Sequence, residues 1–201
     1  TSPYEVRPFE PLRSAYSDYG VTYSADGKTL IFGSNRRRYG AKKDDSPVTG
    51  EPLGALYSLS QRADGSWAVR PDSLRGLSRP RVEQGAPSLS PDGRRLYYSM
   101  IGFDRGKRNV PKIYVSEQGE RCEWREGREL RLFADSTILV AHPSVSPSGH
   151  VLFFVSDAPG GRGGKDLYQV RLDGGRVGEP FPLGAEVNRS EEHTSELQSP
   201  A

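Results

Sequence analysis

The side chains best suited to chemistry are the imidazole of His142 and the carboxylates of Asp157 and Asp166. An imidazole can act as a general base or a metal ligand. The two carboxylates flank a glycine-rich stretch, residues 160–164, that could hold a cation or a phosphate. Glycine-rich phosphate loops lead into a helix, however, whereas the residues after this stretch are typical of a strand. His142 stands alone before a proline at an expected strand start, so we interpret both features as structural.

No residue pattern indicates a nucleophile or a metal centre. The sequence lacks a Gly-x-Ser-x-Gly elbow, and its single cysteine, Cys122, excludes an internal disulfide. No His, Cys and Asp residues have zinc-ligand spacing. We therefore predict no catalytic residue, cofactor or metal in this segment, and no enzyme activity.

Serine recurs instead in a turn motif, Ser-x-[Asp/Ser]-Gly, that occurs three times, each time three residues before an apolar triplet. Glycine supplies the positive φ that such a turn needs, and serine can hydrogen-bond the turn backbone. We assign a structural role to the turn residues Ser24, Asp26, Gly27, Ser90, Asp92, Gly93, Ser146 and Gly149.

The elements around these turns also repeat. After each apolar triplet comes an aliphatic-tyrosine pair, ending at Tyr57, Tyr114 or Tyr168, and then a bulky aromatic residue. That aromatic is Trp67 or Trp124 in the first two copies, and Phe181 is the expected equivalent in the third. Four short segments per copy, bounded by Gly, Pro, Asp and Ser, indicate four strands joined by tight turns, with little helix.

Antiparallel four-stranded units in series are typical of β-propeller blades. We predict an all-β chain with about three blades, at residues 14–77, 80–135 and 138–188. Closed propellers have four to eight blades, so residues 1–188 are expected to be a partial propeller. The aromatic side chains are interpreted as packing between blades.

A loop of variable length separates the second and third strands of each copy, and these loops should emerge together on the face opposite the turns. They contain ten basic residues against five acidic ones. Such a face could recruit an acidic protein surface, an anionic glycan or a phosphorylated lipid headgroup, or its charges could simply be solvated. The basic residues are Arg36, Arg37, Arg38, Lys42, Lys43, Arg105, Lys107, Arg108, Arg162 and Lys165.

Residues 189–201 require a separate explanation. Residues 189–199 back-translate to a sequence that resembles a common short-read sequencing adapter, so we expect a non-native tail and a natural protein that continues past Asn188. Without the tail the chain is mildly basic, far from the charge density of a nucleic-acid binder. No apolar run approaches the length of a membrane span.

Several segments together resemble a known family. Residues 86–93 read Ala-Pro-Ser-Leu-Ser-Pro-Asp-Gly and residues 142–149 read His-Pro-Ser-Val-Ser-Pro-Ser-Gly, which resemble the TolB-type, WD-repeat-like propeller repeat. Residues 14–20, 160–168 and 183–188 are similar to propellers of OmpA-family envelope proteins from Bacteroidetes-type bacteria. Ser148 departs from the pattern, because it replaces the turn aspartate.

The resemblance implies a six-bladed propeller acting as a non-catalytic scaffold in the periplasm, associated with the outer membrane, that docks envelope or secretion-machinery proteins. An alternative with the same repeats is the substrate-gating propeller of a serine peptidase of the prolyl-oligopeptidase type. A propeller enzyme acting at the central channel would need converging His, Asp and Glu at the first-strand starts. Those positions hold Gly20, Ala86 and His142, which argues against it.

Overall fold

The fold is described from a computed structural model, which covers residues 4–37, 44–77, 79–104, 107–120 and 123–188. The predicted tail at 189–201 lies outside these residues. The described part contains three antiparallel sheets and two short 3-10 helices, η1 (Glu10–Leu12) and η2 (Arg75–Leu77), with no α-helix. The prediction of an all-β chain with three four-stranded blades is confirmed.

Each sheet is a simple meander that follows chain order. The first blade orders β1 (Asp18–Tyr23), β2 (Thr29–Ser34), β3 (Ala55–Ser60) and β4 (Asp72–Ser73). The second orders β5 (Val82–Leu89), β6 (Arg95–Asp104), β8 (Lys112–Glu117) and β9 (Arg128–Glu129), while β7 (Lys107–Arg108) pairs with β6. The third orders β10 (Val140–Val145), β11 (Val151–Ser156), β12 (Asp166–Asp173) and β13 (Arg176–Val177), while β14 (Phe181–Pro182) pairs with β12.

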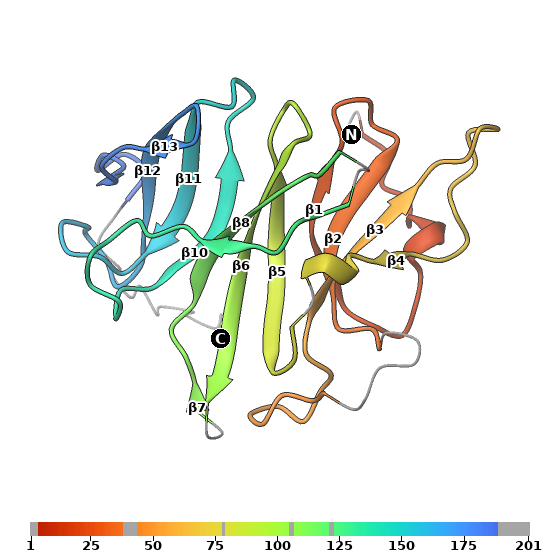
Figure 1. Ribbon diagram of the computed structural model, residues 1–201, viewed down its shortest axis with the longest axis horizontal. Helices are drawn as coiled ribbons and strands as arrows, with labels where there is room; N and C mark the ends of the chain where they lie inside the picture. Colours follow the sequence, from red (N-terminus) through yellow and green to blue (C-terminus); the bar gives the residue numbers. More distant parts are fainter. Residues whose placement is uncertain (1–3, 38–43, 78, 105–106, 121–122, 189–201) are drawn as a thin grey trace, which may run out of the picture.

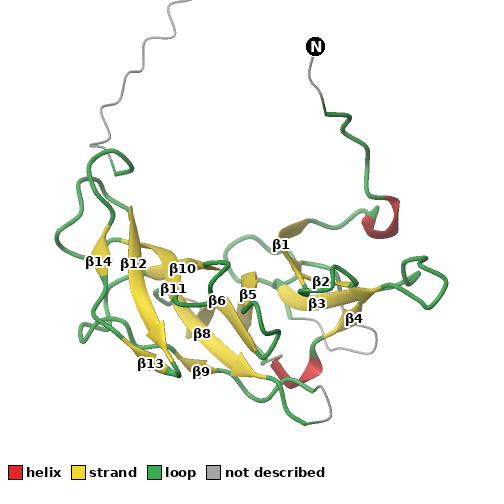
Figure 2. Cartoon of the chain, turned by 90° about the horizontal axis from the view of Figure 1, so that it is seen from above, coloured by secondary structure: helices red, strands yellow, loops and turns green. Residues whose placement is uncertain are grey.

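The blades stand side by side, with the first strands β1, β5 and β10 as neighbours (Figure 1). Seen from above, β1, β5 and β10 lie on one side of the molecule and the last strands β4, β9 and β13 on the other (Figure 2). Each blade is thus oriented like the one before it, as the sequence repeat requires.

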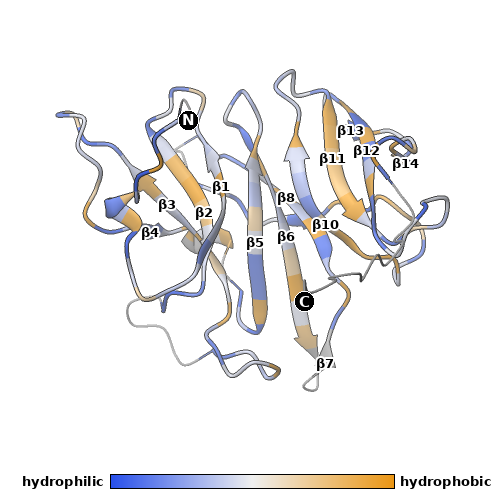
Figure 3. Cartoon of the chain, turned by 180° about the vertical axis from the view of Figure 1, so that it is seen from behind, coloured by the Kyte–Doolittle hydropathy of each residue, from blue (hydrophilic) through white to orange (hydrophobic). Residues whose placement is uncertain are grey.

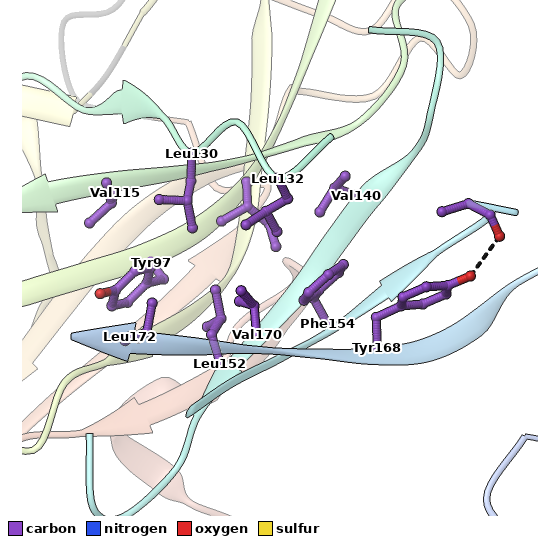
Figure 4. Packing of buried hydrophobic residues seen from close by; sticks show 12 residues of the cluster. Tyr97, Val115, Leu130, Leu132, Val140, Leu152, Phe154, Tyr168, Val170 and Leu172 are labelled. Carbon is purple, nitrogen blue, oxygen red and sulfur yellow. Dashed lines mark hydrogen bonds between the residues drawn. The ribbon is translucent and has the colours of Figure 1, made fainter. Parts of the chain in front are cut away.

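Two hydrophobic seams join the blades. Between the first and second blades, Ile31 and Leu56 pack against Leu96, Tyr98 and Met100. Between the second and third, a larger cluster (Figure 4) contains Tyr97, Ile113, Val115, Leu130, Leu132, Val140, Leu152, Phe154, Tyr168, Val170 and Leu172. The second strands β2 and β11 are correspondingly hydrophobic along most of their length (Figure 3). Burial of these faces is the main force that stacks one blade on the next.

Hydroxyl groups at equivalent positions of the first strands add a hydrogen bond across each seam. Leu89 donates its backbone N–H to Oγ1 of Thr22 at 3.3 Å, and Val145 donates its N–H to Oγ of Ser88 at 2.9 Å. Since the seam would otherwise leave these amides without a partner, each bond satisfies a polar group at the boundary between two blades.

One predicted equivalence is wrong. Trp67 pairs with Gln61, and Trp124 pairs with Gln118. Each glutamine comes four residues after the tyrosine of the aliphatic-tyrosine pair in its blade. In the third blade that position is Leu172, and it pairs with Val177, whereas Phe181 pairs with Gln169. A tight β12–β13 hairpin places a valine where the other blades have tryptophan. The equivalence predicted for Phe181 rested on the size of its aromatic ring alone, which does not determine the pairing.

Candidate functional site

The turn residues predicted from the repeat form the same hydrogen-bond arrangement in the first two blades. Ser24 Oγ donates to Oδ1 of Asp26 at 2.6 Å and accepts the N–H of Thr29 at 2.9 Å. Ser90 repeats both bonds with Asp92 and Arg95. These bonds to the ionised form lower the pKa of both aspartates, with the serine hydroxyl as the largest cause.

The third turn is weaker because Ser148 replaces the aspartate. Ser146 Oγ and Ser148 Oγ lie 3.1 Å apart, and His150 donates its N–H to Ser148 Oγ at 3.4 Å. Gly27, Gly93 and Gly149 all have positive φ, at 69°, 71° and 75°. The turns therefore act as structural corners that mark one face of the molecule.

Arg36, one of the predicted loop cations, is half-buried and held by residues of the first blade. Its guanidinium makes a bidentate ion pair with Asp18, both bonds at 2.7 Å, and its side chain is only 12% exposed. The same group lies over the rings of Phe32 and Tyr57, at 5.4 and 5.6 Å from their centroids. Arg36 thus fixes the start of its loop and contributes little free charge to the surface.

The other loop cations are distributed unevenly. Arg37 pairs with Asp45 at 2.8 Å, whereas no ion pair of Arg162 or Lys165 occurs among the described residues. Arg38, Lys42, Lys43 and Arg105 lie outside the described residues, and only the backbone of Lys107 and Arg108, in β7, is described. The basic face therefore stays a prediction, for which Arg37, Arg162 and Lys165 are the described candidates.

The two carboxylates beside the glycine-rich loop both accept hydrogen bonds from backbone N–H groups. Oδ2 of Asp166, a buried residue, accepts the N–H groups of Arg162 and Gly163 at 2.7 and 2.9 Å, so the loop wraps around it. A Cβ at Gly161 would collide with the same carboxylate, which explains that glycine. Asp157 Oδ1 accepts the N–H of Leu139 at 2.7 Å. The loop is therefore organised by its own aspartate, which favours the structural interpretation over a cation or phosphate site.

A tyrosine hydrogen bond holds the start of this loop and of its counterpart in the first blade. Tyr168 donates its hydroxyl to the carbonyl of Ala158, and Tyr57 donates to that of Arg36, each at 2.6 Å. Burial and nearby carboxylates raise the pKa of Tyr168, so its hydroxyl remains a donor at neutral pH. In both blades the third strand, β3 or β12, therefore holds the start of the loop whose length varies between the repeats.

A groove of about 670 Å³ opens at the starts of the first strands β1, β5 and β10, on the loop side. Sequence reasoning missed this groove, because its walls come from three blades and from segments that enter β8 and β10. Its lining residues are Tyr19, Gly20, Glu83, Gln84, Gly85, Ala86, Ser99, Ile101, Asn109, Val110, Pro111, Thr137, Leu139, Ala141, His142, Val155, Asp157 and Lys165. The walls are thus partly apolar, with both signs of charge among them.

Three bulges shape the floor of the groove. The pairing of first and second strands shifts register after Tyr19, Gly85 and Ala141. The residue at each bulge has positive φ: 60° at Gly20, 46° at Ala86 and 54° at His142. The same bulged backbone conformation thus occurs once in each blade. The blades differ at this position in their side chain, and the third blade has the exposed imidazole of His142.

Tyr19 forms one wall by lying over three glycines. Side chains at Gly33, Gly54 or Gly85 would collide with its ring or hydroxyl. Burial raises the pKa of Tyr19 to about 12, and the charge of Glu83 contributes. The hydroxyl of Tyr19 is therefore protonated at neutral pH.

No helix of the described residues has the length and apolar character needed to cross a membrane. Within the same ranges, no three His, Cys, Asp or Glu side chains are grouped as metal ligands would be. The groove itself is lined by both polar and apolar residues, and the three bulges contribute to its lining.

Neither a protein-family model nor a curated protein matches this chain. Among solved structures it is similar to puromycin hydrolase, with 16% identity and a TM-score of 0.50, over 82% of this chain and 23% of that one. It is also similar to TolB from Acinetobacter baumannii, with 21% identity and a TM-score of 0.47, over 84% and 33%. The chain thus spans a third or less of these proteins, and the likeness concerns the fold, which is that of three β-propeller blades.

Proposed function

We propose that the chain is part of a non-catalytic propeller that binds protein partners in the bacterial cell envelope, and that the loop-side groove is its binding surface. The observation that carries the proposal is the groove itself, formed where the three first strands begin side by side. Its volume of about 670 Å³ falls within the usual range of binding pockets.

The location and class of partner rest on the sequence resemblance. Repeats similar to those of OmpA-family envelope proteins support a periplasmic, outer-membrane-associated scaffold that docks envelope or secretion-machinery proteins. The loop cations Arg37, Arg162 and Lys165 would contribute attraction to an acidic protein, an anionic glycan or a lipid headgroup at the rim.

Site-specific photo-crosslinking in cells that express the full-length protein tests the groove. A photoreactive residue in place of Val110, which lines the groove, should capture a discrete partner. Val69, also an exposed valine but located on the first blade away from the groove, is the matched control position. Equal capture from both positions would remove the groove from the proposal.

A second variant tests the chemistry of the groove without disturbing the fold. His142→Gly removes the imidazole from a backbone position where the first blade already has glycine, so the blade should fold normally. We expect weaker capture from Val110, while His150→Ala, beside a turn on the opposite face, should leave capture unchanged. Capture that is insensitive to His142 would restrict the contact to other walls.

The substrate-gating propeller of a serine peptidase is the second candidate, because puromycin hydrolase shares the fold. Labelling of the full-length protein with a fluorophosphonate probe distinguishes the two, since the probe reacts with an activated serine nucleophile. An envelope scaffold should remain unlabelled, whereas labelling that substrate blocks would favour the peptidase.

A further inference from the structure

Three arginines meet at the seam between the second and third blades, on the turn side of the molecule and away from the groove. Arg95 begins β6, Arg128 lies in β9 and Arg176 lies in β13. All three line one small cavity of about 10 Å³, together with the buried Tyr97. The cluster thus combines two strands of one blade with one strand of the next.

Strand pairing and a tight hairpin bring these side chains together. Val115 of β8 pairs with Tyr97 on one side and with Arg128 on the other, so a single strand separates the arginine of β9 from the tyrosine of β6. In the third blade, Gly174 and Gly175 have positive φ and turn the chain back into β13. A Cβ at Gly175 would lie 3.7 Å from Nη2 of Arg95, which shows that this guanidinium reaches across the seam.

Acidic groups compensate the positive charge of the cluster only in part: Asp92 and Glu117 lie near Arg95, and Asp173 pairs with Arg176 across the β12–β13 hairpin. Nε of Arg95 lies 3.8 Å from Oε1 of Glu117, too far for a direct hydrogen bond, and both side chains are partly exposed. No ion pair of Arg128 or Arg176 is present among the residues that the structure describes. Three guanidinium groups around one opening therefore repel one another, and an anion would relieve that repulsion.

Tyr97 supplies a neutral donor at the base of the cluster. Its ring is packed in the hydrophobic seam with its hydroxyl at the edge (Figure 4). Burial raises the pKa of Tyr97, and this effect is only partly opposed by the charge of Arg95, by a hydrogen bond that Arg95 donates to the hydroxyl, and by the charge of Arg128. The hydroxyl is therefore protonated at neutral pH.

We propose that the cluster of Arg95, Arg128 and Arg176 binds a phosphoryl group across the seam. Guanidinium forks match the oxygens of phosphate in bidentate geometry, and three positive charges favour a dianion over a single carboxylate. The cavity is too small to enclose the group, so the phosphate lies over its mouth and contacts both blades. The group could belong to soluble phosphate or to a lipid headgroup, since both present the same oxygens.

The first test compares thermal stability in inorganic phosphate and in sodium chloride at equal ionic strength. Phosphate should raise the Tm of the chain and of Arg70→Gln, an exposed control arginine on the first blade. Arg95→Gln, Arg128→Gln and Arg176→Gln should each lose most of the difference. Phosphate affinity, measured by calorimetry, should fall about tenfold per arginine removed, since a charge-assisted bond contributes about 1.4 kcal/mol or more. An equal rise in every variant would be a general salt effect and would overturn the proposal.

The second test identifies the source of the phosphoryl group. Vesicles of phosphatidylglycerol in phosphatidylcholine are compared in flotation with phosphatidylcholine alone, for the chain and for the Arg95→Gln/Arg176→Gln double variant. Flotation that requires both phosphatidylglycerol and the arginines supports a lipid headgroup. Calorimetric binding of phosphate without flotation supports a soluble phosphate. Binding to neither, or flotation that the double variant retains, would overturn the proposal.

Discussion

Arg36 combines several interactions within the first blade. It pairs with Asp18, lies over the rings of Phe32 and Tyr57, and its carbonyl accepts the hydroxyl of Tyr57. All of these partners belong to β1, β2 or β3 or to the residues just after them. A single residue therefore connects the start of the loop to three strands of the blade.

We expect Arg36→Ala to lower the free energy of unfolding by about 2–4 kcal/mol, because it leaves the mostly buried Asp18 carboxylate without its partner. Arg13→Ala is the matched control: its ion pair with Glu10 is exposed on both sides, at 76% and 64%, and exposed pairs contribute about 1 kcal/mol or less. Urea unfolding of both variants measures the difference. Similar losses for the two would contradict the structural role of Arg36.

The third turn offers a gain of stability at one residue. In the first two turns an ionised aspartate accepts a serine hydroxyl and a backbone N–H, and its pKa is lowered as a result. Ser148→Asp should restore this arrangement beside Ser146 and raise the Tm by roughly 1–4 °C near neutral pH.

The pH dependence of this gain has a definite sign. A carboxyl whose pKa is lower in the folded than in the unfolded chain stabilises the fold above the unfolded pKa of about 3.9. That stabilisation is lost as the pH falls through the lower, folded pKa. Ser148→Asn is the uncharged control, and its effect on the Tm should not vary with pH over this acidic range. A pH-independent gain for Ser148→Asp would count against the charged hydrogen bond.

At the scale of elements, the bulge in each first strand determines how closely two blades approach. A Cβ at Gly20 would lie 2.8 Å from Cα of Ala86, and Gly20 itself has a φ of 60°. Gly20→Ala should therefore cost backbone strain of about 1–2 kcal/mol and a further amount for the forced separation of β1 and β5.

Gly27→Ala separates these two costs. Gly27 has a similar φ of 69°, but nothing lies within 4 Å of a Cβ at that position. It should lose only the strain, so denaturation of both variants should show Gly20→Ala as clearly the more destabilised. Equal losses would mean that the blades can move apart without cost.

At the scale of the whole molecule, the repeat allowed the architecture to be predicted from sequence, while the groove and the arginine cluster could not be predicted. Strand positions follow from Ser24, Ser90 and Ser146 and the apolar triplets, because turn chemistry and local alternation are encoded within a few residues. The groove and the arginine cluster depend on which residues of different blades become neighbours. Arg95 and Arg176 are distant in sequence, and nothing local to either one indicates that they share a cavity.

The same reason explains why the surroundings of Arg36 and the pairing of Phe181 could not be predicted from the local sequence. Loop position placed Arg36 on the surface, but the ion pair with Asp18 involves a residue on another strand. Phe181 was aligned by its aromatic character, although a hairpin one residue shorter than in the other blades gives that position to Val177. Local composition thus specifies elements, and long-range packing decides the roles of individual side chains.

The remaining loop cations lead to a prediction for the molecule as a binding scaffold. Arg162 and Lys165 lie on the loop that closes one side of the groove, and Lys165 lines it directly. Arg162→Glu/Lys165→Glu should slow association with an acidic partner and weaken the salt dependence of binding, while leaving the Tm within about 1–2 °C. Arg70→Glu changes the same type of charge on the first blade and serves as the control. The test measures association kinetics with the crosslinked partner across a range of salt concentrations. An unchanged association rate would show that these charges are solvated and do not attract the partner.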